Sequence, residues 1–364
     1  MNLRCGIVGL PNVGKSTLFN AISTGSAAAA NFPFCTIEPN VGAARVPDDR
    51  LQTLVSVFKP QKISPAYIEW VDIAGLVQGA SKGEGLGNQF LGHIRTVNVI
   101  VHVLRCFEAS EIVHIRGSVD PLQDKQIIDC ELQLKDLETL ERRLVKIEKK
   151  ALSGDKSAQK ELHLLRQCQK HLDQGKNLRT LDIDQIHAQE LASWGLLTLK
   201  PVLYIANVDE AALSKPSNTQ LSLQTALRKE SSDLIPVCVS LEAQIAAMEL
   251  AEQKEFLQAY GLSCPALDAV VHAAYRKLDL ITYFTAGPEE VRAWTIPQGT
   301  KAPQAAGIIH SDFERGFIRA ETIGMSDLQR YGTEQRCKEA GRVRLEGKQY
   351  VVRDGDILHF RFNV

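Results

Sequence analysis

The sequence predicts an α/β protein with a nucleotide-binding domain, an inserted helical hairpin and a small C-terminal α+β domain. Three observations support this prediction. A glycine-containing loop near the N-terminus lies between an apolar strand-like segment and a helix-like one. In the middle of the chain, apolar residues recur at helical spacing with charges between them. The C-terminal part consists of short β-rich runs separated by turn residues.

Length and charge limit the classes of protein that the chain can belong to. A chain of 364 residues is too long for one typical domain, so two or three domains are expected. The composition is 44% apolar and 23% charged, which is ordinary for a globular protein. The net charge of −1 draws the whole molecule neither to nucleic acid nor to an anionic membrane. Any such binding would come from a local patch.

Targeting signals and cysteine usage suggest a cytoplasmic protein. The residues Met1 to Arg4 run directly into the first predicted strand, so no signal peptide is expected. No apolar run approaches the ~20 residues of a membrane-spanning helix, so no membrane partner is expected. The eight cysteines are scattered, without zinc-type spacing. They are interpreted as reduced thiols, mostly in the core.

The loop Gly9–Thr17 fits the phosphate-binding pattern G-x-x-x-x-G-K-[ST] at every required position. Apolar Cys5, Ile7 and Val8 predict a strand before it, and Ser16–Ile22 predicts a helix after it. In this geometry backbone N–H groups and the positive end of the helix face a phosphate. The alternative is a strand–helix turn that binds nothing.

Each residue of this loop has an expected role. Lys15 is placed to bridge β- and γ-phosphate oxygens, and the Ser16 hydroxyl is expected to bind Mg²⁺. Gly9 and Gly14 allow backbone conformations that a Cβ would obstruct. The residues expected to contact the nucleotide here are Asn12, Val13, Gly14, Lys15, Ser16 and Thr17.

Two further segments predict the rest of the magnesium and γ-phosphate site. The proline-punctuated segment Asn31–Asn40 contains Thr36, which is expected to supply a second hydroxyl to Mg²⁺. The apolar strand that starts at Tyr67 ends in D-x-x-G. Asp72 is expected to hold the Mg²⁺ shell, and the Gly75 N–H to reach the γ-phosphate.

The residue after this glycine is unusual for a GTPase. Ras-like GTPases have a water-orienting glutamine there, and this chain has Leu76, which cannot hydrogen-bond water. The glycines of Gly79–Asn88 suit a nucleotide-dependent switch, or simply a mobile loop. Val97–Leu104 is expected to be a buried strand, and the following loop, Cys106–Asp120, carries His114.

From about Ile128 the pattern changes to amphipathic helix. Gly154-Asp155 interrupts the pattern, which predicts two helices in an antiparallel hairpin. This hairpin is either structural packing or a protruding arm for a partner. The apolar residues at coiled-coil spacing are Leu137, Leu140, Leu144, Ile147 and Ala151, followed by Leu162, Leu165, Cys168 and Leu172.

The base-recognition segment differs from the guanine-specific motif N-K-x-D. After the predicted strand Leu199–Ile205, the chain has Asn207, Val208 and Glu210 at the three motif positions. The lysine is absent and the carboxylate is one methylene longer, which favours adenine, although Glu210 could rotate to meet guanine. Val237–Ser240 is expected to be the last strand and loop, with Ser240 at the base edge.

The C-terminal part predicts a small α+β domain closed by a strand over Ile357–Phe362, after a turn at Asp354-Gly355-Asp356. Basic and acidic residues are about equal in number here, so charge alone does not indicate RNA binding. The other short β-rich runs are Thr282–Phe284, Ala293–Ile296, Phe317–Ala320 and Tyr350–Val352.

Together these residues make the chain similar to the YchF-type ATPases, a family in the Obg branch of P-loop proteins. The similarity spans essentially the whole chain. The resemblance implies a Ras-like P-loop domain (1–127 and 200–279), a helical coiled-coil hairpin (128–199) and a β-grasp, or TGS, domain (280–364). The matching segments are Gly9–Thr17, Asn31–Asn40, Asp72–Val77, Gly79–Ser81, Asn207–Glu210 and Arg292–Pro297.

The resemblance implies an Mg²⁺-dependent ATPase that prefers ATP to GTP. It also implies that His114 orients the attacking water and that the partner is the ribosome or its RNA. Three alternatives stay open from the residues: a true GTPase of the same fold, a nucleotide-gated RNA-binding module with incidental hydrolysis, and a small-molecule kinase. The kinase is disfavoured because D-x-x-G with a glycine-rich switch suits a hydrolase.

Overall fold

A computed structural model of the chain describes residues 3–24, 40–73, 86–109 and 119–363. The fold is α/β, with a P-loop domain and a C-terminal domain, as the sequence predicts. The chain divides into two compact units. The first contains residues 1–43 and 69–270, and the second contains residues 44–68 and 271–364.

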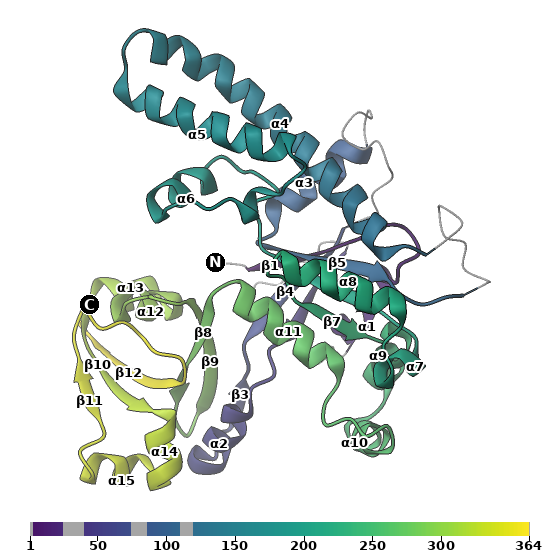
Figure 1. The fold of residues 1–364 in the computed structure, drawn as a ribbon. Coiled ribbons are helices and arrows are strands. Elements are labelled where there is room, and N and C mark those ends of the chain that lie inside the picture. The colour runs from purple at the N-terminus through teal and green to yellow at the C-terminus, as the bar shows by residue number, and fades with distance from the viewer. Residues whose placement is uncertain (1–2, 25–39, 74–85, 110–118, 364) are drawn as a thin grey trace. The chain divides into compact units, whose positions relative to one another are not determined.

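The sheet that carries the phosphate loop has six strands among the described residues, in the order β2-β4-β1-β5-β6-β7. Figure 1 labels β1, β4, β5 and β7 of this sheet. The pairs β1–β4, β1–β5, β5–β6 and β6–β7 are parallel. Their carboxyl ends therefore share one edge, where ligands of such sheets bind. The strands are β1 (Arg4–Val8), β2 (Val41–Arg45), β4 (Tyr67–Asp72), β5 (Val99–Arg105), β6 (Val202–Asn207) and β7 (Leu234–Val237).

The core of this sheet is apolar along whole strands, because parallel strands are covered on both faces. Cys5, Ile7 and Val8 lie in β1, which confirms the predicted strand, and all three are fully buried. The helices of this part of the chain are α1 (Lys15–Thr24), α3 (Leu86–Thr96), α4 (Pro121–Leu152), α5 (Lys156–Asp173), η2 (Leu178–Thr180), α6 (Gln185–Ala192), α7 (Glu210–Ser214), α8 (Asn218–Lys229), α9 (Val239–Ala247), α10 (Leu250–Ala259) and α11 (Ala266–Lys277).

One predicted strand is wrong. The sequence places a strand and loop over Val237–Ser240, but β7 ends at Val237 and α9 begins at Val239. The β-branched residues of this segment favour a strand, yet the backbone N–H of Val239 is bound by the Asn207 side chain at 3.2 Å. That tertiary contact satisfies a free N–H at the start of the helix. Ser240 therefore lies in the first turn of α9.

The predicted helical hairpin is present as α4 and α5, joined by the turn Ser153–Asp155. Helix α4 begins before the predicted Ile128, because Asp120 caps it by accepting from Leu122 N (3.1 Å) and Gln123 N (3.0 Å). The predicted seam is buried: Leu140 and Leu144 pack in one cluster with Leu164, Leu165, Cys168 and Leu172, and Leu137 and Ile147 pack against it.

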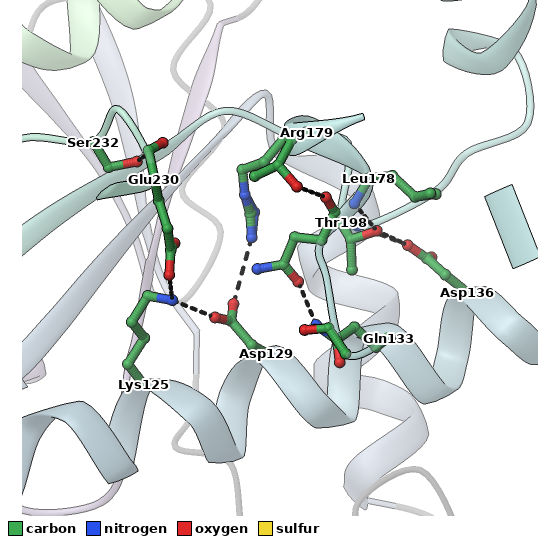
Figure 2. A network of polar contacts seen from close by, with 12 residues as sticks. Lys125, Asp129, Gln133, Asp136, Leu178, Arg179, Thr198, Glu230 and Ser232 are labelled. Carbon is green, nitrogen blue, oxygen red and sulfur yellow. Dashed lines mark hydrogen bonds and ion pairs between the residues drawn. The ribbon is translucent and has the colours of Figure 1, made fainter. Parts of the chain in front are cut away.

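A buried charge cluster fixes the first turns of α4 (Figure 2). Lys125 Nζ donates to Asp129 Oδ2 at 2.8 Å and to Glu230 Oε1, at the end of α8, at 2.9 Å. Asp129 Oδ1 also accepts from Arg179 Nη2 at 3.4 Å. The two carboxylates raise the pKa of Lys125, against the opposing effect of burial. Breaking such a cluster from one side leaves an uncompensated buried charge, which costs about 3–5 kcal/mol.

Two turns further on, Asp136 joins α4 to the chain that leads into β6. Its carboxylate accepts from Leu197 N, Thr198 N and Thr198 Oγ1, each at 2.7 Å. Burial raises the pKa of Asp136, and the three hydrogen bonds oppose that rise. The root of the hairpin is thus held to the end of α8 and to the segment before β6 by polar contacts about two turns apart on α4.

The second unit is built on a mixed sheet of six described strands in the order β11-β10-β12-β8-β9-β3. Its core surrounds Tyr283, whose hydroxyl donates to Ala305 O of α12 at 2.8 Å. Its elements are α2 (Asp49–Phe58), β3 (Lys62–Ser64), β8 (Leu280–Ala286), β9 (Glu290–Pro297), α12 (Ala302–Ile309), α13 (Ser311–Arg315), β10 (Phe317–Gly324), α14 (Met325–Tyr331), α15 (Glu334–Glu339), β11 (Arg344–Glu346) and β12 (Asp356–Phe362).

This unit differs from the predictions in two places. The expected strand Tyr350–Val352 is wrong: Val351 makes only an isolated bridge with Lys301. Residues 44–68, assigned from the sequence to the P-loop domain, group with the C-terminal residues. The reason is that β3 pairs in parallel with β9, from Lys62 opposite Glu290 to Ser64 opposite Arg292.

Candidate functional site

The phosphate loop connects the end of β1 to α1, and its two glycines are sterically required. A Cβ on Gly9 would lie 2.5 Å from Val103 O of β5. A Cβ on Gly14 would lie 2.4 Å from Asn207 Nδ2, and Gly14 has a φ of +97°. Asn12 also has a positive φ, 61°, which asparagine tolerates better than most residues. The loop conformation thus depends on these three residues.

Lys15, the first residue of α1, is buried at the base of this loop with 8% of its surface exposed. Its ammonium donates to Leu10 O at 2.8 Å. Burial lowers the pKa of Lys15, and the nearby carboxylate of Asp72 partly offsets this effect. A buried cation held mainly by a neutral carbonyl gains strongly from an added anion. This arrangement suits a phosphate.

Ser16 and Asp72 meet beside Lys15, at the ends of α1 and β4. The Ser16 hydroxyl donates to Asp72 Oδ2 at 2.9 Å. The other oxygen, Asp72 Oδ1, is buried and has no hydrogen-bond partner among the described residues. A hydroxyl and a carboxylate are the hard oxygen donors that Mg²⁺ binds, and a cation would satisfy the unpaired oxygen. The residues present therefore fit magnesium.

A cavity of about 630 Å³ opens over this loop. Of the residues predicted to contact the nucleotide, Asn207, Val208 and Ser240 line it from β6 and α9. Val13 does not line it but contributes its backbone carbonyl to the loop's support. The phosphate-loop residues that line the cavity are Asn12, Gly14, Lys15, Ser16 and Thr17.

Asn207 supports the phosphate loop as well as lining the cavity. Its Nδ2 donates to Val13 O at 2.9 Å, and its Oδ1 accepts from Val239 N at 3.2 Å. One side-chain amide thus ties the loop after β1 to the start of α9. We expect Asn207 to position both walls of the cavity.

The two other residues of the base segment have different environments. Val208 is buried and lines the cavity. Glu210 is exposed, begins α7, and is not among the described residues that line the cavity. Asp209, between them, lines the cavity and accepts from Ala212 N at 2.8 Å as the N-cap of α7.

Three cavity residues were not predicted from the sequence: Phe107, Asp209 and Val239. Phe107 lies two residues beyond β5, and the Arg105 guanidinium carbon lies 4.6 Å from the centre of its ring. An aromatic residue just past the carboxyl end of a parallel strand is a usable signal, because that edge faces the ligand. Val239 offered no such signal, because the segment that contains it, Val237–Ser240, was predicted as a strand and loop and not as the start of a helix.

Several predicted site residues lie outside the described residues. These are Thr36, Gly75 and His114, together with Leu76 and the glycine-rich segment up to residue 85. Their roles stay predictions. Among the described residues, no group of three or more His, Cys, Asp or Glu side chains is arranged to hold a metal ion. No described helix has the length and apolar character needed to cross a membrane.

Family models match both ends of the chain. Residues 4–151 match a model described as "50S ribosome-binding GTPase". Residues 280–363 match the YchF-GTPase_C model, described as "Protein of unknown function (DUF933)".

Individual relatives match over the full length. The Ribosome-binding ATPase YchF of Escherichia coli O157:H7 is 52% identical over 365 residues, covering 100% of both chains. Its counterpart from Bacillus subtilis (strain 168) is 50% identical over 366 residues, again with 100% coverage of both. The solved structure of the Schizosaccharomyces pombe YchF GTPase superposes with a TM-score of 0.90 at 39% identity, covering 99% of this chain and 98% of that one.

Proposed function

We propose, since the chain belongs to the YchF family, that it is an Mg²⁺-dependent ATPase acting as a slow nucleotide switch on the ribosome. The reaction is ATP plus water to ADP plus phosphate. The observation that carries the proposal is the buried Lys15 ammonium beside the Ser16–Asp72 pair, in a cavity large enough for a nucleotide. A ribosomal partner also supports a cytoplasmic location.

The chemistry follows from how charge develops on the γ-phosphoryl group during in-line attack by water. Lys15 exchanges its bond to Leu10 O for phosphate oxygens and stabilises that charge from a site with little water. Ser16, Thr36 and Asp72 would hold Mg²⁺, which neutralises phosphate charge. The Gly75 N–H is proposed to bind the γ-phosphate.

Water orientation is assigned to His114. Leu76 replaces the glutamine of Ras-like GTPases and has no hydrogen-bonding group. The loop that carries His114 follows β5, whose carboxyl end lies at the ligand edge of the sheet. An imidazole entering from this loop would hydrogen-bond the attacking water.

Preference for ATP over GTP rests on the base segment. Asp209 already accepts a backbone N–H of α7, and Glu210 is exposed. Val208 presents an apolar side chain where the guanine-specific motif has lysine. This arrangement lacks the free aspartate that would pair with guanine N1–H and its 2-amino group. GTP is therefore the weaker ligand.

The test is steady-state hydrolysis and competition binding with the purified chain. Lys15→Ala should reduce kcat for ATP about 100-fold or more, because a preorganised charge at the transition state is lost. Lys254→Ala, at an exposed position on α10, is the matched control and should retain full activity. Hydrolysis by Lys15→Ala at the wild-type rate and affinity would refute the assignment.

A further inference from the structure

The joined ends of α4 and α5, residues 142–160, concentrate positive charge on a chain with a net charge of −1. We call this segment the hairpin tip. It contains seven lysines and arginines against two acidic residues, a net charge of +5. It lies at the end of the hairpin that points away from β5 (Figure 1). Its five lysines are all exposed: Lys146, Lys149, Lys150, Lys156 and Lys160.

The acidic residues of the tip are already engaged elsewhere. Asp155 caps α5 by accepting from Ser157 N (2.8 Å) and Ala158 N (3.2 Å). Glu148 lies 3.5 Å from Arg166. None of the five lysines has an ion-pair partner in the part of the chain that the structure describes. Their charges face solvent.

Helix stability accounts for only part of this pattern. Lys149 and Lys150 are in the last turn of α4, where the helix dipole favours cations. Lys156 is the first residue of α5, where the dipole disfavours cations, and the first turn of α5 has no acidic residue. An acidic residue at this position would therefore stabilise α5 more than Lys156 does.

The basic residues lie on the solvent side of the hairpin. On α4, Lys149 and Lys150 lie three and four residues after Lys146, so they share a face with it. That face is opposite to Leu144 and Ala151, which are buried. Lys146 and Lys150 are about 6 Å apart along the helix axis, given the rise of ~1.5 Å per residue.

The hairpin is attached to the rest of the P-loop unit at its root, the end opposite to the tip. The Lys125 cluster and Asp136 attach α4 to α8 and to the segment before β6 (Figure 2). Leucine-rich packing between α4 and α5 then continues from Leu140 outward. The tip is therefore the free end of a packed helical hairpin whose other end is attached to the P-loop unit.

We propose that the hairpin tip binds the phosphate backbone of RNA. The inference rests on the proposed function, and it specifies which surface meets the ribosome and which chemistry of the ribosome it meets. Solvent-exposed lysines are strongly hydrated point charges that gain binding energy by releasing counterions from phosphates. Protein interfaces, in contrast, are depleted in lysine and depend on buried aromatic or arginine anchors.

The test replaces three tip lysines together: Lys146→Gln, Lys150→Gln and Lys156→Gln. The matched control removes three exposed lysines away from the tip: Lys170→Gln near the hairpin root, Lys229→Gln and Lys254→Gln. Binding is measured to purified Escherichia coli ribosomes by co-sedimentation, and to a 20-base-pair RNA duplex by fluorescence anisotropy between 50 and 300 mM salt.

We expect the tip variant to bind both probes at least tenfold more weakly than the control at 100 mM salt. The slope of log Kobs against log[salt] should become about 2 to 3 units less negative, since each phosphate contact contributes about 0.7 to 0.9. ATP hydrolysis without ribosomes should be unchanged. Equal affinity and slope in the tip and control variants would overturn the inference.

A second variant separates binding from helix stability. Lys156→Glu places an acid at the start of α5, so it should stabilise the hairpin slightly while weakening RNA binding. Unchanged RNA binding by this variant would contradict the inference. The inference would also be contradicted if the tip lysines were needed for binding to anionic phospholipid vesicles and the protein did not bind RNA. If wild type fails to sediment with ribosomes, the proposed function itself fails. If wild type and tip variant sediment equally, only the tip assignment fails.

Discussion

His114 is the residue whose proposed role makes the sharpest kinetic prediction. A group that orients water acts mainly in the transition state, so its loss should lower kcat and leave binding of ATP nearly unchanged. We expect His114→Ala to reduce kcat about tenfold or more. Single-turnover hydrolysis and equilibrium binding of ATP measure the two quantities separately. An unaltered kcat would mean that His114 takes no part in hydrolysis. A large loss of ATP affinity would mean that His114 binds the nucleotide.

Val208 and Glu210 make a prediction about base specificity. Val208→Lys with Glu210→Asp restores the guanine-specific motif N-K-x-D, with Asp209 as its free position. Relative affinity should shift from ATP towards GTP by about tenfold, or 1.4 kcal/mol, because a carboxylate can then pair with guanine. Competition binding with both nucleotides checks this. A wild-type chain that already prefers GTP tenfold would show that Glu210 reaches the base.

At the scale of elements, β5 carries a buried histidine next to the hairpin root. His102 packs 5.6 Å from the Tyr204 ring of β6, and its Nε2 has no hydrogen-bond partner among the described residues. Burial lowers the pKa of His102 from 6.5 to about 3. Among the charged groups around it, Asp129 opposes this shift, and Lys125, Arg179 and Lys15 reinforce it. The folded strand therefore keeps this imidazole neutral.

The consequence is a loss of stability in acid. Below pH 6.5 the unfolded chain takes up a proton at His102 that the folded chain does not bind until about pH 3. The free energy of unfolding should fall as pH decreases through this window, by about 1.4 kcal/mol at pH 5.5 from this group. His102→Phe should remove that part of the pH dependence, whatever its effect at pH 7.5. Urea unfolding at both pH values measures it, with exposed His163→Gln as a control that keeps the wild-type slope.

At the scale of the whole molecule, nucleotide should stabilise the unit that contains the phosphate loop. Mg²⁺ with ATP at 100 times its Kd adds about 2.7 kcal/mol to that unit. We expect its melting transition to rise by about 5 to 10 °C. Differential scanning calorimetry should also show a smaller rise with GTP at the same concentration. Lys15→Ala should show no rise, and an equal rise with that variant would contradict phosphate binding at this loop.

The sequence alone was enough to predict the phosphate loop with the strand before it and the helix after it. A strand, a loop with fixed spacing and a helix are contiguous in the chain, although the atoms that make Gly9 and Gly14 necessary belong to Val103 and Asn207 on other strands. The apolar spacing of Leu140 and Leu144 likewise predicts the hairpin, because helix periodicity is a property of neighbouring residues. The fold class, and the family resemblance that the comparisons confirm, followed from such local patterns.

Contacts between residues that are distant in the chain were decided only by the tertiary structure. Val239 begins a helix because the Asn207 side chain, from another strand, binds its N–H. Residues 44–68 join the C-terminal unit because β3 pairs with β9. Phe107 and Asp209 reach the cavity through the order of the strands. The Asn207–Val239 hydrogen bond and the β3–β9 pairing have no local sequence pattern, because each depends on which parts of the folded chain lie side by side.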